Sequence, residues 1–147
     1  MSVEVSTDAT RLDVERIHRW LSEDAYWSLG RTRDVVERSI EHSLNFGAYA
    51  DSGEQVGYAR VVTDHATFAW LADVWVDERA RGQGVARAMV KWFVDHPDFA
   101  GIRRMALVTA DAHGVYEALG FHALIRPGRY MERLAPGFAD ALRATPE

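Results

Sequence analysis

An apolar strand pattern runs directly into a glycine-containing loop and then into a helical pattern. Residues 66–76 are rich in β-branched and aromatic side chains, which is typical of a strand. Residues 84–96 carry apolar side chains at helical spacing, which predicts a helix with one buried face. The residues expected on that face are Val85, Met89, Trp92 and Phe93. The junction reads RARGQGVA at 79–86, and because glycine weakens both helices and strands, its two glycines predict an unusual backbone or a close approach to it.

The remaining patterns predict a mixed α/β fold in a single domain of residues 1–147. Strands are expected at 3–7, 46–50, 55–64, 103–109, 121–125 and 129–134, and helices at 7–21, 33–44 and 112–119. In the second helix, Val35, Ser39 and His42 lie along one stripe. This order predicts a mixed, mostly antiparallel central sheet with helices on both faces and one strand–helix–strand crossover at its centre.

Composition argues against several classes of function. The net charge of −5 at pH 7 is unlike that of nucleic-acid-binding proteins, which usually carry a basic face. There is no run of about 18 apolar residues to span a membrane and no signal-peptide pattern. The chain has no cysteine, and its six histidines lack paired ligand spacing, so no metal site is expected. We therefore expect a cytoplasmic protein that binds neither nucleic acid nor membrane.

The junction at 79–86 is suited to a diphosphate. The first N–H groups of a helix have no partner within it, and the helix dipole favours an anion there. A Walker loop is excluded because no Lys-Ser or Lys-Thr pair follows the glycines. A dinucleotide-binding loop is disfavoured because Arg87 stands where a third glycine is needed. The alternative is a tight turn that needs glycine only for its own geometry.

The spacing of Arg79, Gly82 and Gly84 resembles the Arg/Gln-x-x-Gly-x-Gly/Ala loop of the GNAT acetyltransferase superfamily, which holds the pyrophosphate of acetyl-coenzyme A. The sequence VYEALGF at 115–121 resembles the second signature of that family, and the order of elements is similar over nearly the whole chain. The resemblance implies acetyl-coenzyme A as co-substrate. The residues that it implies for coenzyme binding are Val74, Trp75, Val76, Arg79, Arg81, Gly82, Gln83, Gly84, Val85, Ala86 and Thr109.

Two positions depart from patterns within the superfamily. Thr109 stands where the second signature often has an Asn that contacts the pantetheine arm, and it offers a hydrogen bond with less reach. Trp70 stands where the histone-modifying branch has a Glu, so histone acetylation is not supported.

The resemblance also implies catalytic roles. The backbone N–H of Val76 or its neighbour would donate to the thioester oxygen, and Tyr116 would protonate the leaving thiolate. Tyr116 could instead be a core aromatic residue that packs on Leu119 and Phe121. Asp73 is the candidate base on the strand before the loop, or alternatively it anchors a neighbouring loop.

The acceptor side is expected in residues 24–33, where Trp27 and Arg31 are the candidate substrate-binding residues. They could stack on an aromatic acceptor or grip a carboxylate, or they could simply cover the sheet.

The resulting hypothesis is an N-acetyltransferase that acts on a primary amine of a small molecule or on an exposed amino group of a protein or peptide. The alternative is a binding module of the same fold that senses acyl-coenzyme A without turnover. A homodimer is a further possibility.

Overall fold

The computed structural model of the protein describes residues 2–145. The chain divides into two compact units, Met1–Val108 and Thr109–Glu147. The single domain over 1–147 stays a prediction.

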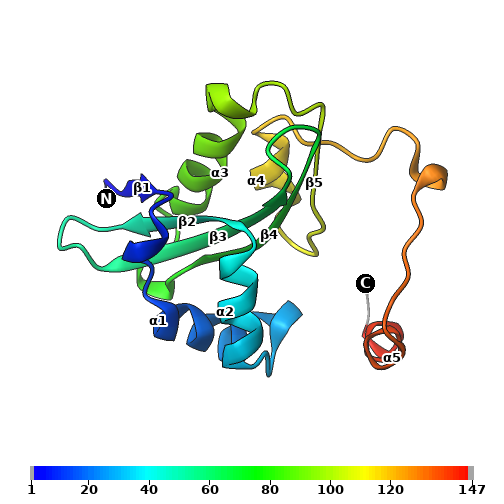
Figure 1. The fold of residues 1–147 in the computed structure, drawn as a ribbon, viewed down its shortest axis with the longest axis horizontal. Coiled ribbons are helices and arrows are strands. Elements are labelled where there is room, and N and C mark those ends of the chain that lie inside the picture. The colour runs from blue at the N-terminus through cyan, green and yellow to red at the C-terminus, as the bar shows by residue number, and fades with distance from the viewer. Residues whose placement is uncertain (1, 146–147) are drawn as a thin grey trace. The chain divides into compact units, whose positions relative to one another are not determined.

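The first unit contains a five-stranded sheet (Figure 1). Its strands, in spatial and chain order, are β1 (Glu4–Ser6), β2 (Leu44–Tyr49), β3 (Gln55–Thr63), β4 (Phe68–Val76) and β5 (Arg104–Ala106). Neighbours are antiparallel from β1 to β4, whereas β5 runs parallel to β4. The mixed, mostly antiparallel sheet is therefore confirmed. The crossover was expected at its centre, which is wrong, because β5 is the last strand of the described sheet.

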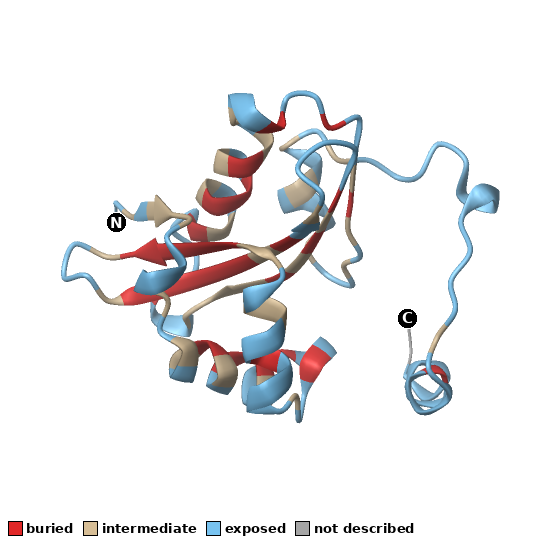
Figure 2. Cartoon of the chain, viewed as in Figure 1, coloured by how far each residue is buried: buried red, intermediate tan, exposed pale blue. Residues whose placement is uncertain are grey.

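Helices cover both faces of this sheet, as predicted. On one face, α1 (Val14–Arg19) and α2 (Arg33–Glu41) pack over a buried cluster that includes Ile17, Trp20 and Tyr58. On the other face lies α3 (Val85–Asp95), and its Phe93 ring meets Phe46 of β2 at 5.9 Å. The alternation of side chains along the strands supplies both cores, and Figure 2 shows β2 and β3 buried along most of their length.

Gly57 of β3 sets how closely α3 approaches the sheet. A Cβ atom at Gly57 would lie 3.0 Å from Met89 Cε and 3.1 Å from Val85 Cγ1. The glycine therefore lets two side chains of the α3 face that was predicted to be buried rest directly on the strand backbone.

Two helical predictions need correction. The helix expected at 7–21 is interrupted, because Asp13 caps the N-terminus of α1 by accepting from Arg16 N–H, and a separate 3₁₀ turn lies at Ala9–Arg11. In α2, Val35 of the predicted stripe is exposed, whereas its neighbour Val36 is fully buried. Ile40, four residues after Val36, packs on the same core cluster, so the inner stripe is shifted by one residue.

The second unit contains α4 (His113–Glu117) and α5 (Pro136–Ala144). The strands predicted at 121–125 and 129–134 are wrong, because no strand is found in the described part of this unit. A strand needs a hydrogen-bonded neighbour, and β propensity alone does not supply one. The helix α5 was not predicted, although Pro136 at its first position and its alanines are signals for it.

Candidate functional site

The loop before α3 turns through two left-handed glycines. Gly82 has φ of 76° and Gly84 has φ of 77°, a region that side-chain-bearing residues rarely adopt. Gly84 is the N-cap of α3, and its carbonyl accepts the N–H of Ala88 at 2.9 Å. The two glycines therefore give the end of the loop the backbone conformation from which α3 begins.

The backbone N–H groups of residues 84–87 make no hydrogen bond to any residue that the structure describes. They form the first turn of an eleven-residue helix, and their partial positive charge adds to that of the helix dipole. This arrangement suits a phosphate or diphosphate group, and the coenzyme contact at this loop stays a prediction.

Strand β4 pairs with β3 along most of its length but with β5 only at its start. Its pairing with β5 covers residues 68–70, whereas its pairing with β3 extends to Val76. Asp77 N–H donates to Val56 O of β3, so the alternation along a strand directs the N–H of Val76 and Val74 to the opposite edge. That edge has no pairing with β5. Val76 O accepts from Arg81 Nε at 3.1 Å, and the N–H groups of Val74 and Val76 are open to a ligand.

A β-bulge interrupts β4 at Asp73. Tyr58 pairs with Trp75 and Arg60 pairs with Ala72, so two residues of β4 lie opposite Ala59. Asp73 itself has a φ of 53°, which is uncommon for a residue with a side chain. Such strain persists only where the surroundings stabilise it, and it often marks a functional site.

Three side chains donate hydrogen bonds to the carboxylate of Asp73. Trp27 Nε1 donates to Oδ1 at 3.0 Å, and Arg31 Nη1 and Arg60 Nε both donate to Oδ2 at 2.8 Å. Burial acts to raise the pKa of Asp73, but the charges of Arg60 and Arg31 outweigh it and hold this pKa below its usual value. The carboxylate is therefore ionised and saturated with donors at neutral pH, which favours the anchoring alternative over the role of a base.

The structure thus brings Trp27 and Arg31 together with Asp73, although the sequence did not predict their direct contact. The ring of Trp27 also meets that of Tyr26 at 5.0 Å and that of Trp75 at 6.1 Å, both edge-to-face. The loop between α1 and α2 is therefore held against β4. Arg60 was not predicted as a site residue, and the available signal was a lone arginine within the apolar strand pattern of residues 55–64.

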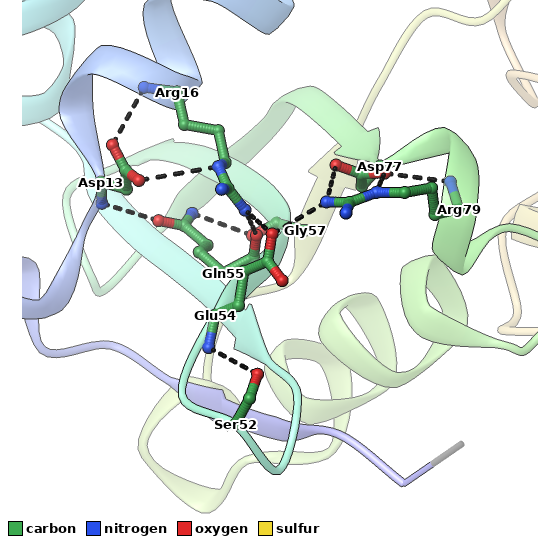
Figure 3. Close-up of polar contacts among 8 residues, drawn as sticks. All are labelled: Asp13, Arg16, Ser52, Glu54, Gln55, Gly57, Asp77 and Arg79. Atoms are coloured by element: carbon green, nitrogen blue, oxygen red, sulfur yellow. Dashed lines mark hydrogen bonds and ion pairs between the residues drawn. The ribbon is translucent and has the colours of Figure 1, made fainter.

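The two arginines of the loop before α3 differ in their partners. Arg79 pairs with Asp77 at 3.1 Å and with Glu54 at 2.8 Å (Figure 3). Glu54 also binds Arg16 of α1 at 2.7 Å. Arg81 has no ion pair with the described residues, and its guanidinium lies 4.7 Å from the centre of the Trp75 ring.

Comparison with known proteins identifies the family. The model of the Acetyltransferase (GNAT) family matches residues 14–121, which is more than half of the chain. The chain belongs to the GNAT family. Its members are acetyltransferases that use acetyl-coenzyme A as co-substrate.

Individual relatives agree with this assignment. The chain is 46% identical to a GNAT-family protein from Xanthomonas campestris pv. campestris whose crystal structure is known, with a TM-score of 0.88 over 93% of this chain and 96% of that one. It is 30% identical to the "Putative acetyltransferase FG08082" of Gibberella zeae, over 73% of this chain and 71% of the relative. Glucosamine-6-phosphate N-acetyltransferase from Arabidopsis thaliana shares the fold, with a TM-score of 0.63 at 14% identity over 92% of this chain and 98% of that one.

The GNAT loop pattern occurs twice in this chain, two residues apart. The pattern fits Arg79, Gly82 and Gly84, and it also fits Arg81, Gly84 and Ala86 with the same spacing. In the second reading the first glycine is the N-cap of α3. Because Arg79 is already paired with two carboxylates and Arg81 is not, the structure favours the second reading.

The remaining GNAT candidates lie in the second unit. Tyr116, at the end of α4, is half-buried, and its ring meets that of Phe121 edge-to-face at 5.9 Å. The Thr109 hydroxyl accepts the N–H of Ala112 at 3.0 Å, so it takes part in the turn before α4. The acid role of Tyr116 and the coenzyme contact of Thr109 stay predictions.

No cluster of three metal-ligating side chains exists among residues 2–145. Within the same range, no helix combines the length and the apolar character that crossing a bilayer requires.

Replacement of Asp73 by Asn distinguishes an anchor from a base. Asn tolerates the positive φ but leaves Arg31 and Arg60 without their counter-charge, so we expect a loss of about 3 kcal/mol in the free energy of unfolding at pH 7. The native pKa of Asp73 is lowered, so ionisation of Asp73 stabilises the fold above the unfolded pKa of about 3.9, and this stabilisation is lost as pH falls through the native pKa. Urea unfolding at pH 7 and pH 3 measures both effects.

The control is Asp51→Asn, in the exposed turn between β2 and β3, which should unfold like the wild type at both pH values. A stable Asp73→Asn protein that has lost only turnover would contradict the anchoring role and support a base.

Proposed function

We propose that this protein transfers an acetyl group from acetyl-coenzyme A to a primary amine, either of a small molecule or of an exposed amino group on a protein or peptide. The observation that carries the proposal is the succession of an unpaired β4 edge and an anion-binding helix start. Together they offer main-chain groups for the pantetheine arm and N–H donors for the diphosphate of one extended ligand.

The reacting groups follow from this placement. With the diphosphate at residues 84–87 and the pantetheine arm along Val74–Val76, the N–H of Val76 donates to the thioester oxygen as charge builds on it. The amine nitrogen attacks the carbonyl carbon, the carbon–sulfur bond breaks, and the sulfur leaves as a thiolate. The amine must first lose one proton to water, which costs roughly 4.6 kcal/mol at pH 7 for a lysine-like amine of pKa about 10.4. The nitrogen loses its second proton to water as the carbon–sulfur bond breaks.

Tyr116 is our candidate for the acid that protonates the thiolate. A phenol of pKa about 10 is protonated at neutral pH, and a thiolate of pKa about 8.5 can accept its proton at a small cost. Thr109 is the candidate contact for the pantetheine arm. Asp73 is assigned the anchoring of Trp27 and Arg31 on the acceptor side.

A thiol-release assay with acetyl-coenzyme A and a panel of amines tests this function. Release that depends on an amine supports the enzyme. Tight binding of acetyl-coenzyme A, measured by calorimetry, without release on any amine would contradict turnover and support the acyl-coenzyme A sensor instead.

Replacement of Gly84 by Val tests the anion-binding loop. A side chain is strained at this positive φ and adds bulk where the diphosphate would approach, so we expect acetyl-coenzyme A to bind at least tenfold more weakly. Isothermal titration calorimetry measures the change. The matched control is Gly53→Val, which imposes the same strain at φ +87° in the exposed turn between β2 and β3. Equal affinities in the two variants would show that strain, and not the loop, explains any loss.

Replacement of Tyr116 by Phe removes the acid while keeping the ring. We expect kcat to fall at least tenfold, with the KM for acetyl-coenzyme A within about twofold of the wild type. Tyr130→Phe, in the same unit, is the control and should retain full turnover. A Tyr116→Phe enzyme with unchanged kcat would assign the ring to packing on Phe121.

We also propose that two copies of the chain associate through residues 121–134. This segment exposes large apolar side chains, with Ile125 at 81% and Met131 at 98% of their full exposure. Sedimentation velocity at micromolar concentration should detect a dimer, and a monomer would contradict the proposal.

A further inference from the structure

We propose that the acceptor amine carries a carboxylate and that Arg31 binds it. This inference rests on the proposed acetyl transfer and narrows its acceptor to amines of the amino-acid type. It arises from the balance of charge around Asp73.

The side chains at Asp73 carry two positive charges and one negative charge. The guanidinium groups of Arg31 and Arg60 both contact the same carboxylate oxygen. The side chains are 21%, 15% and 2% exposed for Arg31, Arg60 and Asp73, in that order. Within the described chain, neither arginine has a second carboxylate partner. Arginine does not lose its proton in proteins, so the site retains one excess positive charge that is largely withdrawn from water.

Of the two arginines, Arg31 has more N–H groups that make no hydrogen bond to the described residues. Arg60 uses Nε for Asp73 and Nη1 for the Ser43 hydroxyl at 3.2 Å. The guanidinium of Arg31 makes one hydrogen bond within residues 2–145, from Nη1 to Asp73. Its remaining N–H groups can form a two-pronged contact with a second carboxylate, which is the strongest geometry available to arginine.

The position of this positive charge relative to the proposed thioester suits the carboxylate of an acceptor. Asp73 lies three residues before Val76 on β4, a separation of about 10 Å along a strand. The excess charge therefore lies near the strand end where we place the thioester. An acceptor that carries both groups would place its carboxylate on Arg31 and its amine toward the thioester.

The carboxylate of Asp73 orients the side chain of Arg31 before any ligand binds. Arg31 comes from the loop between α1 and α2, and Asp73 holds its side chain together with that of Trp27. A donor that is already oriented loses little conformational entropy when the ligand binds.

The experiment compares amino acids with their carboxamides as acceptors in the thiol-release assay. The two members of each pair share the amine and differ in the carboxylate. For the wild type we expect kcat/KM to be at least tenfold higher for the acid. The higher amine pKa of the acid works against this result, so a preference cannot come from amine reactivity.

Arg31→Gln should bring the acid-to-amide ratio near one, with the KM for acetyl-coenzyme A within about threefold of the wild type. Arg31→Lys, which keeps the charge but not the two-pronged geometry, should give an intermediate ratio and tests the idea if the Gln variant does not fold. The matched control is Arg33→Gln, since Arg33 pairs with Glu37 on the exposed face of α2 and should leave the ratio unchanged.

A binding measurement separates this inference from the transfer reaction. N-acetylated amino acids should raise the melting temperature of the wild type but not of Arg31→Gln, whereas their amides should raise neither. Amine-dependent thiol release with equal kcat/KM for acids and amides would overturn the carboxylate site and leave the transferase standing. Absence of release on any amine would overturn the transferase, and the melting shift would still decide whether Arg31 binds a carboxylate.

Discussion

The buried carboxylate of Asp73 is the interaction on which the arrangement of the site depends. It lies at a β-bulge in β4 and accepts from Trp27, Arg31 and Arg60, which come from the loop between α1 and α2 and from β3. Ion pairs of this kind are stable only when the carboxylate is well satisfied, and here both of its oxygens have partners. One ionised side chain thereby fixes the loop, the adjacent strand and the bulge relative to one another.

The same strand also prepares the coenzyme side. After Trp70, β4 has no pairing with β5, and the edge that carries the N–H of Val76 is open to a ligand. The loop that follows ends at Gly84, where the unpaired N–H groups of α3 begin. The anchored Asp73 and the open edge at Val76 therefore belong to the same strand, so that in the proposed function β4 would serve both the acceptor and the coenzyme.

Local patterns predicted the elements of the first unit well and those of the second unit poorly. The strands around 46–76 and the helix α3 depend on alternation and on helical spacing, which the sequence displays directly. The strands expected at 121–125 and 129–134 depend on a hydrogen-bonding neighbour, which no local pattern can guarantee. The error of one residue in the stripe of α2 has a similar origin, because Val35 and Val36 are equally apolar and only the packing of the helix chooses between them.

By itself the sequence determined the succession of strand, two-glycine loop and helix, because these features depend on neighbouring residues. Only the tertiary structure decided the role of Asp73. Its partners Trp27, Arg31 and Arg60 lie 46, 42 and 13 positions away in the chain, and the bulge that turns Asp73 toward them exists only when β3 and β4 pair. The excess positive charge at this site is likewise a property of the folded chain, since it appears when two distant guanidinium groups share one buried carboxylate.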